Sequence, residues 1–68
     1  MFHYAFLSAP KEPPITADLV DAIIKPICLK VQASTVATHT NPWIVIVHCS
    51  EELTDQERTL IEQAIEEI

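Results

Sequence analysis

Two cysteines and three histidines are the side chains best suited to bind a metal or to act as a nucleophile. The candidate metal ligands are Cys28, His39, His48 and Cys49. Zinc sites combine such ligands at short, regular spacings, and the intervals in this chain match none of those patterns. His48 and Cys49 are also neighbours in an apolar run, and neighbouring residues of a strand point to opposite faces of a sheet. We therefore predict that the protein holds no metal and no cofactor.

Thiol catalysis is the second chemistry that these residues suggest. Cys49 could pair with His48 or His39, and it lies just before a predicted helix whose dipole favours a thiolate. Glu51 and Glu52 follow the cysteine, and their negative charge opposes ionisation of the thiol. A chain of 68 residues also has little room for a substrate pocket. We predict that the protein is not an enzyme, and a cysteine-dependent enzyme ranks third among the functions considered.

The composition argues against several other classes. The chain has no glycine, which excludes the glycine-rich loops that hold nucleotide phosphates. Its four basic residues do not cluster, so there is no electrostatic footprint for nucleic acid. No apolar run approaches the roughly 18 residues that a membrane span requires. The first residues lack the basic segment of a signal peptide, so we expect a cytoplasmic protein with reduced thiols.

Size and charge describe a single small acidic domain, residues 1–68. A core of this size supplies only about 3 to 5 kcal/mol, so support from a partner copy would be normal. The net charge of −6 comes from residues 51–68, where Arg58 is the only base among seven acids, whereas residues 1–50 carry three acids and three lysines. An acidic helix face formed by Glu62, Glu66 and Glu67 is either a solvated surface or a recognition surface for a basic partner.

Three apolar runs predict strands. They cover residues 2–7, 27–33 and 43–48, and β-branched or aromatic residues are frequent in them. The second and third form a hairpin with a long polar loop at residues 34–42. In one hairpin register Cys28 lies opposite Cys49, and a shift by one residue in either direction separates the two thiols. In every register two small buried hydrophobic residues are the simplest interpretation.

Two helices are indicated by their caps. Thr16 precedes an apolar stripe of Leu19, Val20, Ile23 and Ile24, and Pro26 stops this helix at about Lys25. Thr54 and Glu57 fit a capping box that begins the second helix. Its core stripe is predicted to contain Leu60, Ile61, Ala64, Ile65 and Ile68.

The element order is therefore β-α-β-β-α. A β-α-β crossover makes the first two strands parallel, and the hairpin makes the third antiparallel to the second. Residues 43–47 carry no charge, as expected of a central strand, whereas Lys30 and Gln32 suit an edge. We predict an α+β split β-α-β sandwich, with a mixed sheet of order 1-3-2 and both helices on one face. At the level of architecture this resembles a ferredoxin-like fold that lacks its last strand.

The uncovered sheet face is the main prediction about function. Two helices cover only one face, and residues 43–47 are apolar on both, so one apolar set is left over. The first strand adds either Ala5 and Leu7 or Phe2 and Phe6 to it, and its outer edge is free to pair with another chain. Monomers seldom expose such a patch. We predict a homodimer or larger oligomer whose interface is drawn from Phe2, Phe6, Ile44, Val45, Ile46 and Val47.

The hairpin loop gives an alternative. Its hydroxyl and amide groups are typical of turns, with Asn41 held extended before Pro42. They could also form a ligand site between subunits, made by Thr38, His39, Thr40, Asn41 and Trp43.

The first-ranked function is thus a small non-enzymatic binding module. It would act as a homo-oligomer and as a regulatory or inhibitory protein that binds itself and a host or partner protein. Such a compact chain would fit a phage or mobile-element gene. The runner-up is a small-ligand binding protein that holds a metabolite or nucleotide at the hairpin loop between subunits. Neither nucleic acid nor a membrane is an expected partner.

Overall fold

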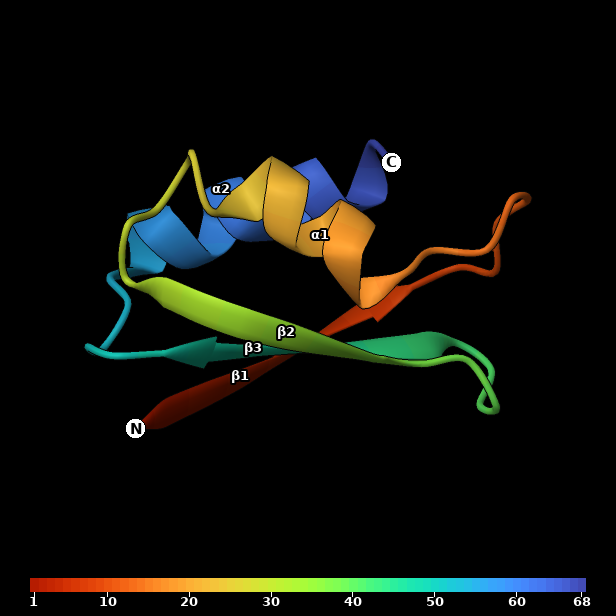
Figure 1. Cartoon of the computed structure of the whole chain (residues 1–68), viewed down its shortest axis with the longest axis horizontal. Helices are drawn as coiled ribbons and strands as arrows, with labels where there is room; N and C mark the ends of the chain where they lie inside the picture. Colours follow the sequence, from red (N-terminus) through yellow and green to blue (C-terminus); the bar gives the residue numbers. More distant parts are fainter.

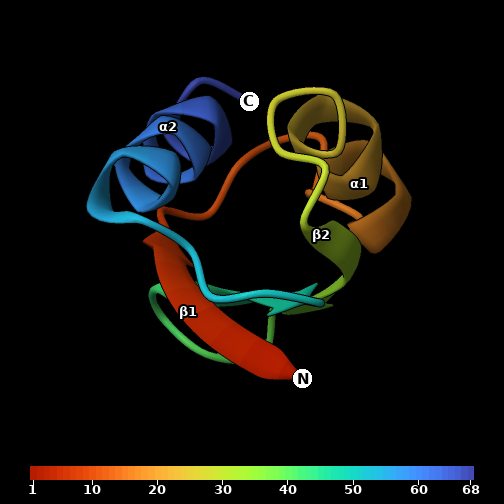
Figure 2. The same cartoon turned by 90° about the vertical axis from the view of Figure 1, so that its left-hand side faces the viewer.

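A three-stranded sheet carries two helices on one of its faces in the computed structural model, which describes residues 1–68 (Figure 1). In chain order the elements are β1 (Phe2–Ser8), α1 (Ala17–Ile24), β2 (Val31–Ala37), β3 (Trp43–Cys49) and α2 (Asp55–Glu66). Helix α1 packs against β2, and α2 packs against β1 and α1 (Figure 2). The chain is a small α+β domain, as the sequence predicts.

The strand order is β1-β3-β2, which confirms that β3 is central. Both neighbours of β3 run antiparallel to it. The prediction of a mixed sheet was therefore wrong. Strands β1 and β2 do run in the same direction, but β3 lies between them, so every adjacent pair is antiparallel.

The predicted start of β2 was also wrong, because the strand begins at Val31 and not at residue 27. The amides of Ile27 and Cys28 both donate to the carbonyl oxygen of Ile24, at 3.1 and 3.0 Å, and so continue the turn of α1. A backbone amide used in this way cannot join a strand ladder. Of the three apolar residues before Val31, only Cys28 reaches the core, whereas Ile27 and Leu29 are exposed. The hairpin loop shortens to residues 38–42.

The hairpin register opposes Val31 to Cys49 and Ser34 to Val47. Because the ladder begins at Val31, Cys28 lies outside it and does not oppose Cys49, and a bulge between Val31 and Ala33 then shifts the pairing. Both cysteines are buried free thiols. This agrees with their interpretation as small buried hydrophobic residues.

The core lies between the sheet and the helices. Strand β3 contributes alternate side chains to it, including Val45 and Val47, which are fully buried. Ile24 of α1 and Ile61 of α2 are equally inaccessible and close the core from the helix side. Every buried side-chain polar atom has a hydrogen-bond partner, so the core carries no unsatisfied polar group.

Both helix caps are confirmed. The Thr16 hydroxyl accepts from the amide of Leu19 at 3.2 Å, and the capping box of Thr54 and Glu57 is complete. The apolar stripes are narrower than predicted, because Leu19 and Leu60 are 40% and 43% exposed. A helix at the surface of so small a domain buries only the side chains that point directly at the sheet.

The connector between β1 and α1 is fixed at both ends. Ile15 is buried beside α1, and Lys11 donates from Nζ to the carbonyl oxygens of Glu66 and Ile68, at 2.8 Å each. No residue has a positive φ, which is consistent with a chain without glycine. Neither helix has the length and apolar character needed to cross a membrane.

Candidate functional site

The sheet face turned away from the helices, called the open face below, is uncovered. Its cross-strand rows follow from the register of the two strand pairs. One row contains His3, His48 and Ala33, the middle row contains Ala5, Ile46 and Thr35, and the last row contains Leu7, Ile44 and Ala37. None of these side chains is an acid, a lysine or an arginine. The open face is therefore a continuous surface without permanent charge.

This geometry corrects the predicted interface. Ile44 and Ile46 belong to the open face, whereas Val45, Val47 and Phe6 are buried under the helices. Buried side chains cannot contact a second molecule while the domain stays folded. Phe2 is exposed, but because side chains alternate along a strand, it belongs to the same helix-facing side of β1 as Phe6.

The neighbours of Ile44 and Ile46 on β1 are therefore Leu7 and Ala5, the first of the two predicted alternatives. Leu7, on the edge strand β1, is 63% exposed. The apolar patch thus extends from the central strand to the edge of the sheet.

A histidine pair stands at one end of the open face. His3 Nδ1 lies 2.6 Å from His48 Nδ1, and the rings meet edge to face with centroids 4.6 Å apart. His48 Nε2 lies 3.3 Å from the hydroxyl of Thr35. His3 is not among the predicted site residues, although the predicted strand order places a residue of the first strand beside His48. The pair can share one proton between its two ring nitrogens.

The candidate metal ligands, and the candidate pair of Cys49 with a histidine, do not come together. His48 lies on the open face and Cys49 in the core, and nowhere do three or more side chains of histidine, cysteine, aspartate or glutamate converge as a metal site would require. Burial raises the pKa of Cys49 and also that of Cys28. A thiol with a raised pKa is a weak nucleophile at neutral pH. Cys49 therefore has neither a base beside it nor a local environment that favours its thiolate.

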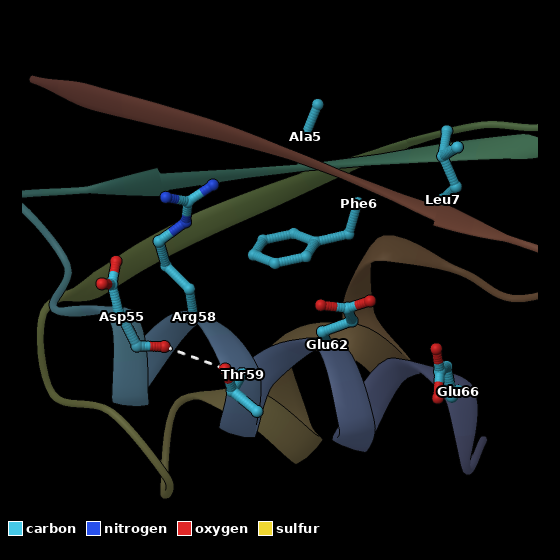
Figure 3. A pocket seen from close by; sticks show the side chains of 8 residues that line it. All are labelled: Ala5, Phe6, Leu7, Asp55, Arg58, Thr59, Glu62 and Glu66. Atoms are coloured by element: carbon cyan, nitrogen blue, oxygen red, sulfur yellow. Dashed lines mark hydrogen bonds between the residues drawn. The ribbon is translucent and has the colours of Figure 1, made fainter.

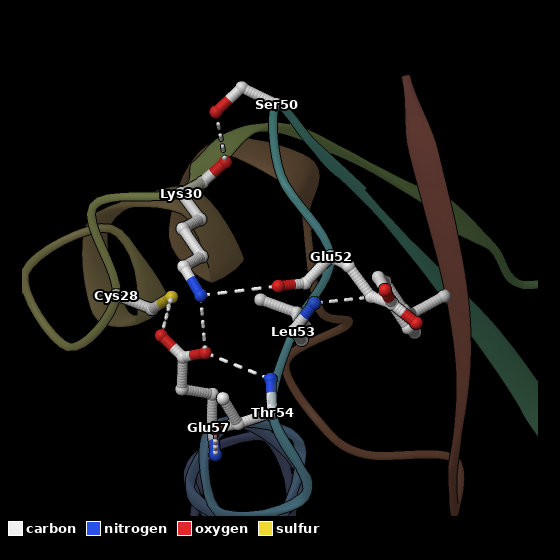
Figure 4. Close-up of polar contacts among 8 residues, drawn as sticks. Cys28, Lys30, Ser50, Glu52, Leu53, Thr54 and Glu57 are labelled. Carbon is white, nitrogen blue, oxygen red and sulfur yellow. Dashed lines mark hydrogen bonds and ion pairs between the residues drawn. The ribbon is translucent and has the colours of Figure 1, made fainter.

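A polar cluster joins the segment before β2 to the start of α2 (Figure 4). Glu57 Oε1 accepts from Lys30 Nζ at 2.8 Å and from the amide of Thr54 at 2.9 Å, and Cys28 Sγ donates to Oε2 at 3.4 Å. Lys30 also donates to the carbonyl oxygen of Glu52. The hydrogen bond from Lys30, with further donation from Thr54, lowers the pKa of Glu57 to about 2. Its polar groups bond to one another, so the cluster has a structural role in joining the two segments.

The one cavity of the domain is a groove of about 540 Å³ between β1 and α2 (Figure 3). Its lining consists of Ala5, Phe6, Leu7, Asp55, Arg58, Thr59, Glu62 and Glu66. Phe6 and Glu62 point into the space between strand and helix, whereas Ala5 points away from α2 (Figure 3). The groove was not predicted, but its helical wall follows the spacing of one helix face.

Charge in this groove is mostly negative. Glu62 and Glu66 form no ion pair, since the two ion pairs of the domain join Lys25 with Asp21 and Lys30 with Glu57. The guanidinium of Arg58 lies over the ring of Tyr4, 5.5 Å from its centre. The predicted acidic face is therefore divided, because Glu62 and Glu66 line the groove and Glu67 does not.

Within one chain, the residues of the predicted ligand site at the hairpin loop do not converge. Thr38, His39 and Asn41 are exposed, and Thr40 donates from its hydroxyl to the carbonyl oxygen of Pro42 at 2.9 Å, which closes the turn. Trp43 is buried on the helix side of the sheet and cannot stack on a ligand held by the loop. No cavity lies beside these residues. The hydrogen bond of Thr40 is typical of turn chemistry.

Comparison with protein-family models, with curated proteins and with solved structures gives no match.

Proposed function

We propose that this chain is a small non-enzymatic binding module that acts as a homodimer and binds a partner protein in a regulatory or inhibitory role. The observation that carries the proposal is the open face, on which Leu7, Ile44 and Ile46 form an uncovered apolar patch. Sheets with such a face pack against another sheet and bury the patch between them. A second copy of the chain supplies a matching face.

The distribution of charge supports a second copy as the occupant. Each chain carries a net charge of −6, which would repel another copy if it were spread evenly. The acids of residues 51–68 belong to α2 and the segment that leads into it, and α2 lies on the side of the sheet opposite the open face (Figure 2). Two copies that join by their open faces therefore keep their acidic helices on the outside.

The size of the open face determines how tightly we expect the dimer to associate. Strands of about seven residues in a three-stranded sheet cover roughly 14 by 23 Å. This footprint, roughly 320 Å² per copy, is well below the about 800 Å² per partner of a standard specific interface and is typical of weak, transient complexes. We expect a dimer that dissociates in the micromolar range, which suits a protein whose association is regulated.

The test is the mass of the protein in sedimentation equilibrium over a range of micromolar concentrations. We expect the mass to rise toward twice the 7.6 kDa of one chain. Thr35→Arg places a charge in the middle row of the open face and should leave the protein monomeric. Thr38→Arg makes the same change in the exposed hairpin loop and should leave the dimer intact. A wild-type mass of 7.6 kDa at all concentrations would overturn the proposal.

Two further features belong to this proposal. The strand order β1-β3-β2 with two helices supports a ferredoxin-like architecture without its last strand. Two free thiols suit a reducing compartment, and we place the module in the cytoplasm on that ground.

A further inference from the structure

Strand β1 has a neighbour on one side only. It pairs with β3 along its whole length, from Phe2 to Ser8, and its other edge borders the groove beneath α2. The outer amide and carbonyl groups of an edge strand are unpaired and can form a ladder with an added strand. The unpaired backbone donors and acceptors of β1 therefore border the groove.

The topology defines how a strand would fit there. The unit β1-α1-β2 is a crossover with β3 inserted between its two strands. A strand that followed β3 and α2 in the same pattern would lie at the outer edge of β1, so that β1 would separate it from β3. Crossovers of this kind share one hand and place the second strand parallel to the first. A strand at this edge would thus run parallel to β3 and antiparallel to β1, and α2 would cover one side of it.

The groove also has the length that a short strand needs. Its helical wall extends from Asp55 to Glu66. Eleven steps along a helix span about 17 Å, and a strand covers that distance with about five residues. A strand of this length adds main-chain hydrogen bonds along most of β1.

The carboxylates of the groove indicate which side chains the added strand should carry. Side chains of the added strand that point toward α2 would contact Glu62 and Glu66, which form no ion pair. They would also contact the ring of Phe6, which lines the same groove from β1. Lysine or arginine at these positions would pair with the carboxylates, and their long stems would cover the phenylalanine ring. Side chains on the other side would continue the open face beyond Leu7 and should be apolar.

A second copy of β1 suits this edge less well. Strand β1 contains no lysine or arginine. Antiparallel pairing of two β1 strands would also place two copies of α2 side by side, and the carboxylates of Glu62 and Glu66 would face those of the other copy. Like charges in such positions are destabilising.

We propose that the groove between β1 and α2 binds an extended segment of a partner protein, in which basic and apolar residues alternate, as a fourth strand antiparallel to β1. This proposal deepens the proposed function, since it names the surface and the chemistry through which the module would bind its partner. Main-chain pairing supplies the fit, and the acidic wall supplies the selectivity for a basic segment.

The probe is a fluorescein-labelled peptide of sequence Lys-Val-Lys-Val-Lys-Val-Lys, titrated with the full chain and followed by fluorescence anisotropy. We expect binding that weakens at high salt and no binding of the peptide with glutamate in place of lysine. The double change Glu62→Lys with Glu66→Lys should weaken binding by at least about tenfold, because two attractions become repulsions. Equal binding of the two peptides would overturn the proposal.

A matched pair of variants separates the groove from general electrostatics. Glu66→Lys alters the groove, whereas Glu67→Lys makes the same change at the next residue, outside it. Both place a cation at the C-terminal end of α2, where the helix dipole tolerates it, so both should fold. We expect Glu66→Lys to weaken binding severalfold and Glu67→Lys to have little effect. An equal loss in both variants would refute the groove as the site.

Methylation of peptide amides tests the ladder. Two versions of the peptide carry N-methyl groups on alternate residues, one on the lysines and one on the valines. Only one set can face β1, so one version should lose binding and the other should retain it. If both versions bind as well as the parent peptide, strand addition is wrong.

The mass measurement keeps this proposal separate from the dimer. Thr35→Arg lies on β2, away from the groove, so a monomeric Thr35→Arg protein should still bind the peptide. Peptide binding by a wild-type protein that is monomeric would overturn the dimer and support the groove. If the peptide dissociates a wild-type dimer, the two sites overlap, and this outcome would support the groove and overturn the open face as the dimer interface.

Discussion

Lys30 Nζ lies 2.8 Å from Glu57 Oε1, and this ion pair joins the segment before β2 to the first turn of α2. Both side chains are about a quarter exposed, and Glu57 also completes the capping box with Thr54. The pair therefore fixes the position at which the second helix begins. In a domain with so small a core, such a contact matters for the orientation of α2 over β1, and hence for the groove.

The ion pair predicts how stability depends on pH. The folded protein lowers the pKa of Glu57 from 4.5 to about 2, chiefly through the hydrogen bond from Lys30. Its charged form thus stabilises the fold above pH 4.5, and this contribution is lost as the pH falls through about 2. Urea midpoints measured from pH 7 to pH 2 should fall more steeply for the wild type than for Glu57→Gln. Glu67→Gln, which removes a carboxylate without a bonded partner, should follow the wild type.

The helix caps give a second prediction. Thr54→Ala removes the hydroxyl that accepts from the amide of Glu57, and Thr16→Ala removes its counterpart in α1. Each change should lower the free energy of unfolding by about 1 kcal/mol, measured by urea denaturation. Thr38→Ala is the control, because Thr38 is exposed and forms no cap, and should change stability by less than about 0.5 kcal/mol.

The strand order and the two caps follow from the sequence for local reasons. The caps depend on residues three positions apart, and the central strand is recognisable because residues 43–47 carry no charge. The start of β2 does not follow, because Ile27 and Cys28 have the composition of a strand while their amides bond to Ile24. Whether these residues form a strand or continue the turn of α1 depends on how the chain leaves the helix. The apolar pattern does not indicate this.

The candidate surfaces were predicted only in part. Alternation along β3 shows that one apolar set must be left over, but choosing Ile44 and Ile46 over Val45 and Val47 requires knowing on which side the helices pack. The groove depends on the distance between β1 and α2, a tertiary quantity. Trp43 was misplaced because nearness in sequence to the loop was taken as nearness in space, whereas its side chain points into the core.

The core predicts a contrast between neighbours on α2. Ile61 is fully buried and Leu60 is 43% exposed. Ile61→Ala should cost about 2 to 5 kcal/mol because it leaves a cavity, and this approaches the whole stability of a domain of this size. Leu60→Ala should cost less than about 1 kcal/mol, since little apolar area is lost. Urea denaturation or circular dichroism during heating would measure both, and similar losses would contradict the placement of the α2 stripe.

The two thiols provide a test of the cysteine-dependent alternative. Cys28 and Cys49 are buried, and burial raises the pKa of each. In the folded protein at neutral pH, a disulfide reagent such as Ellman's reagent should therefore react slowly with both, at a rate limited by opening of the domain. In urea both thiols should react at the rate of a free cysteine. Cys49→Ser would assign the two reactions. Rapid reaction of Cys49 in the folded state would restore a nucleophilic role for this residue, and it would contradict the assignment of both thiols to the core.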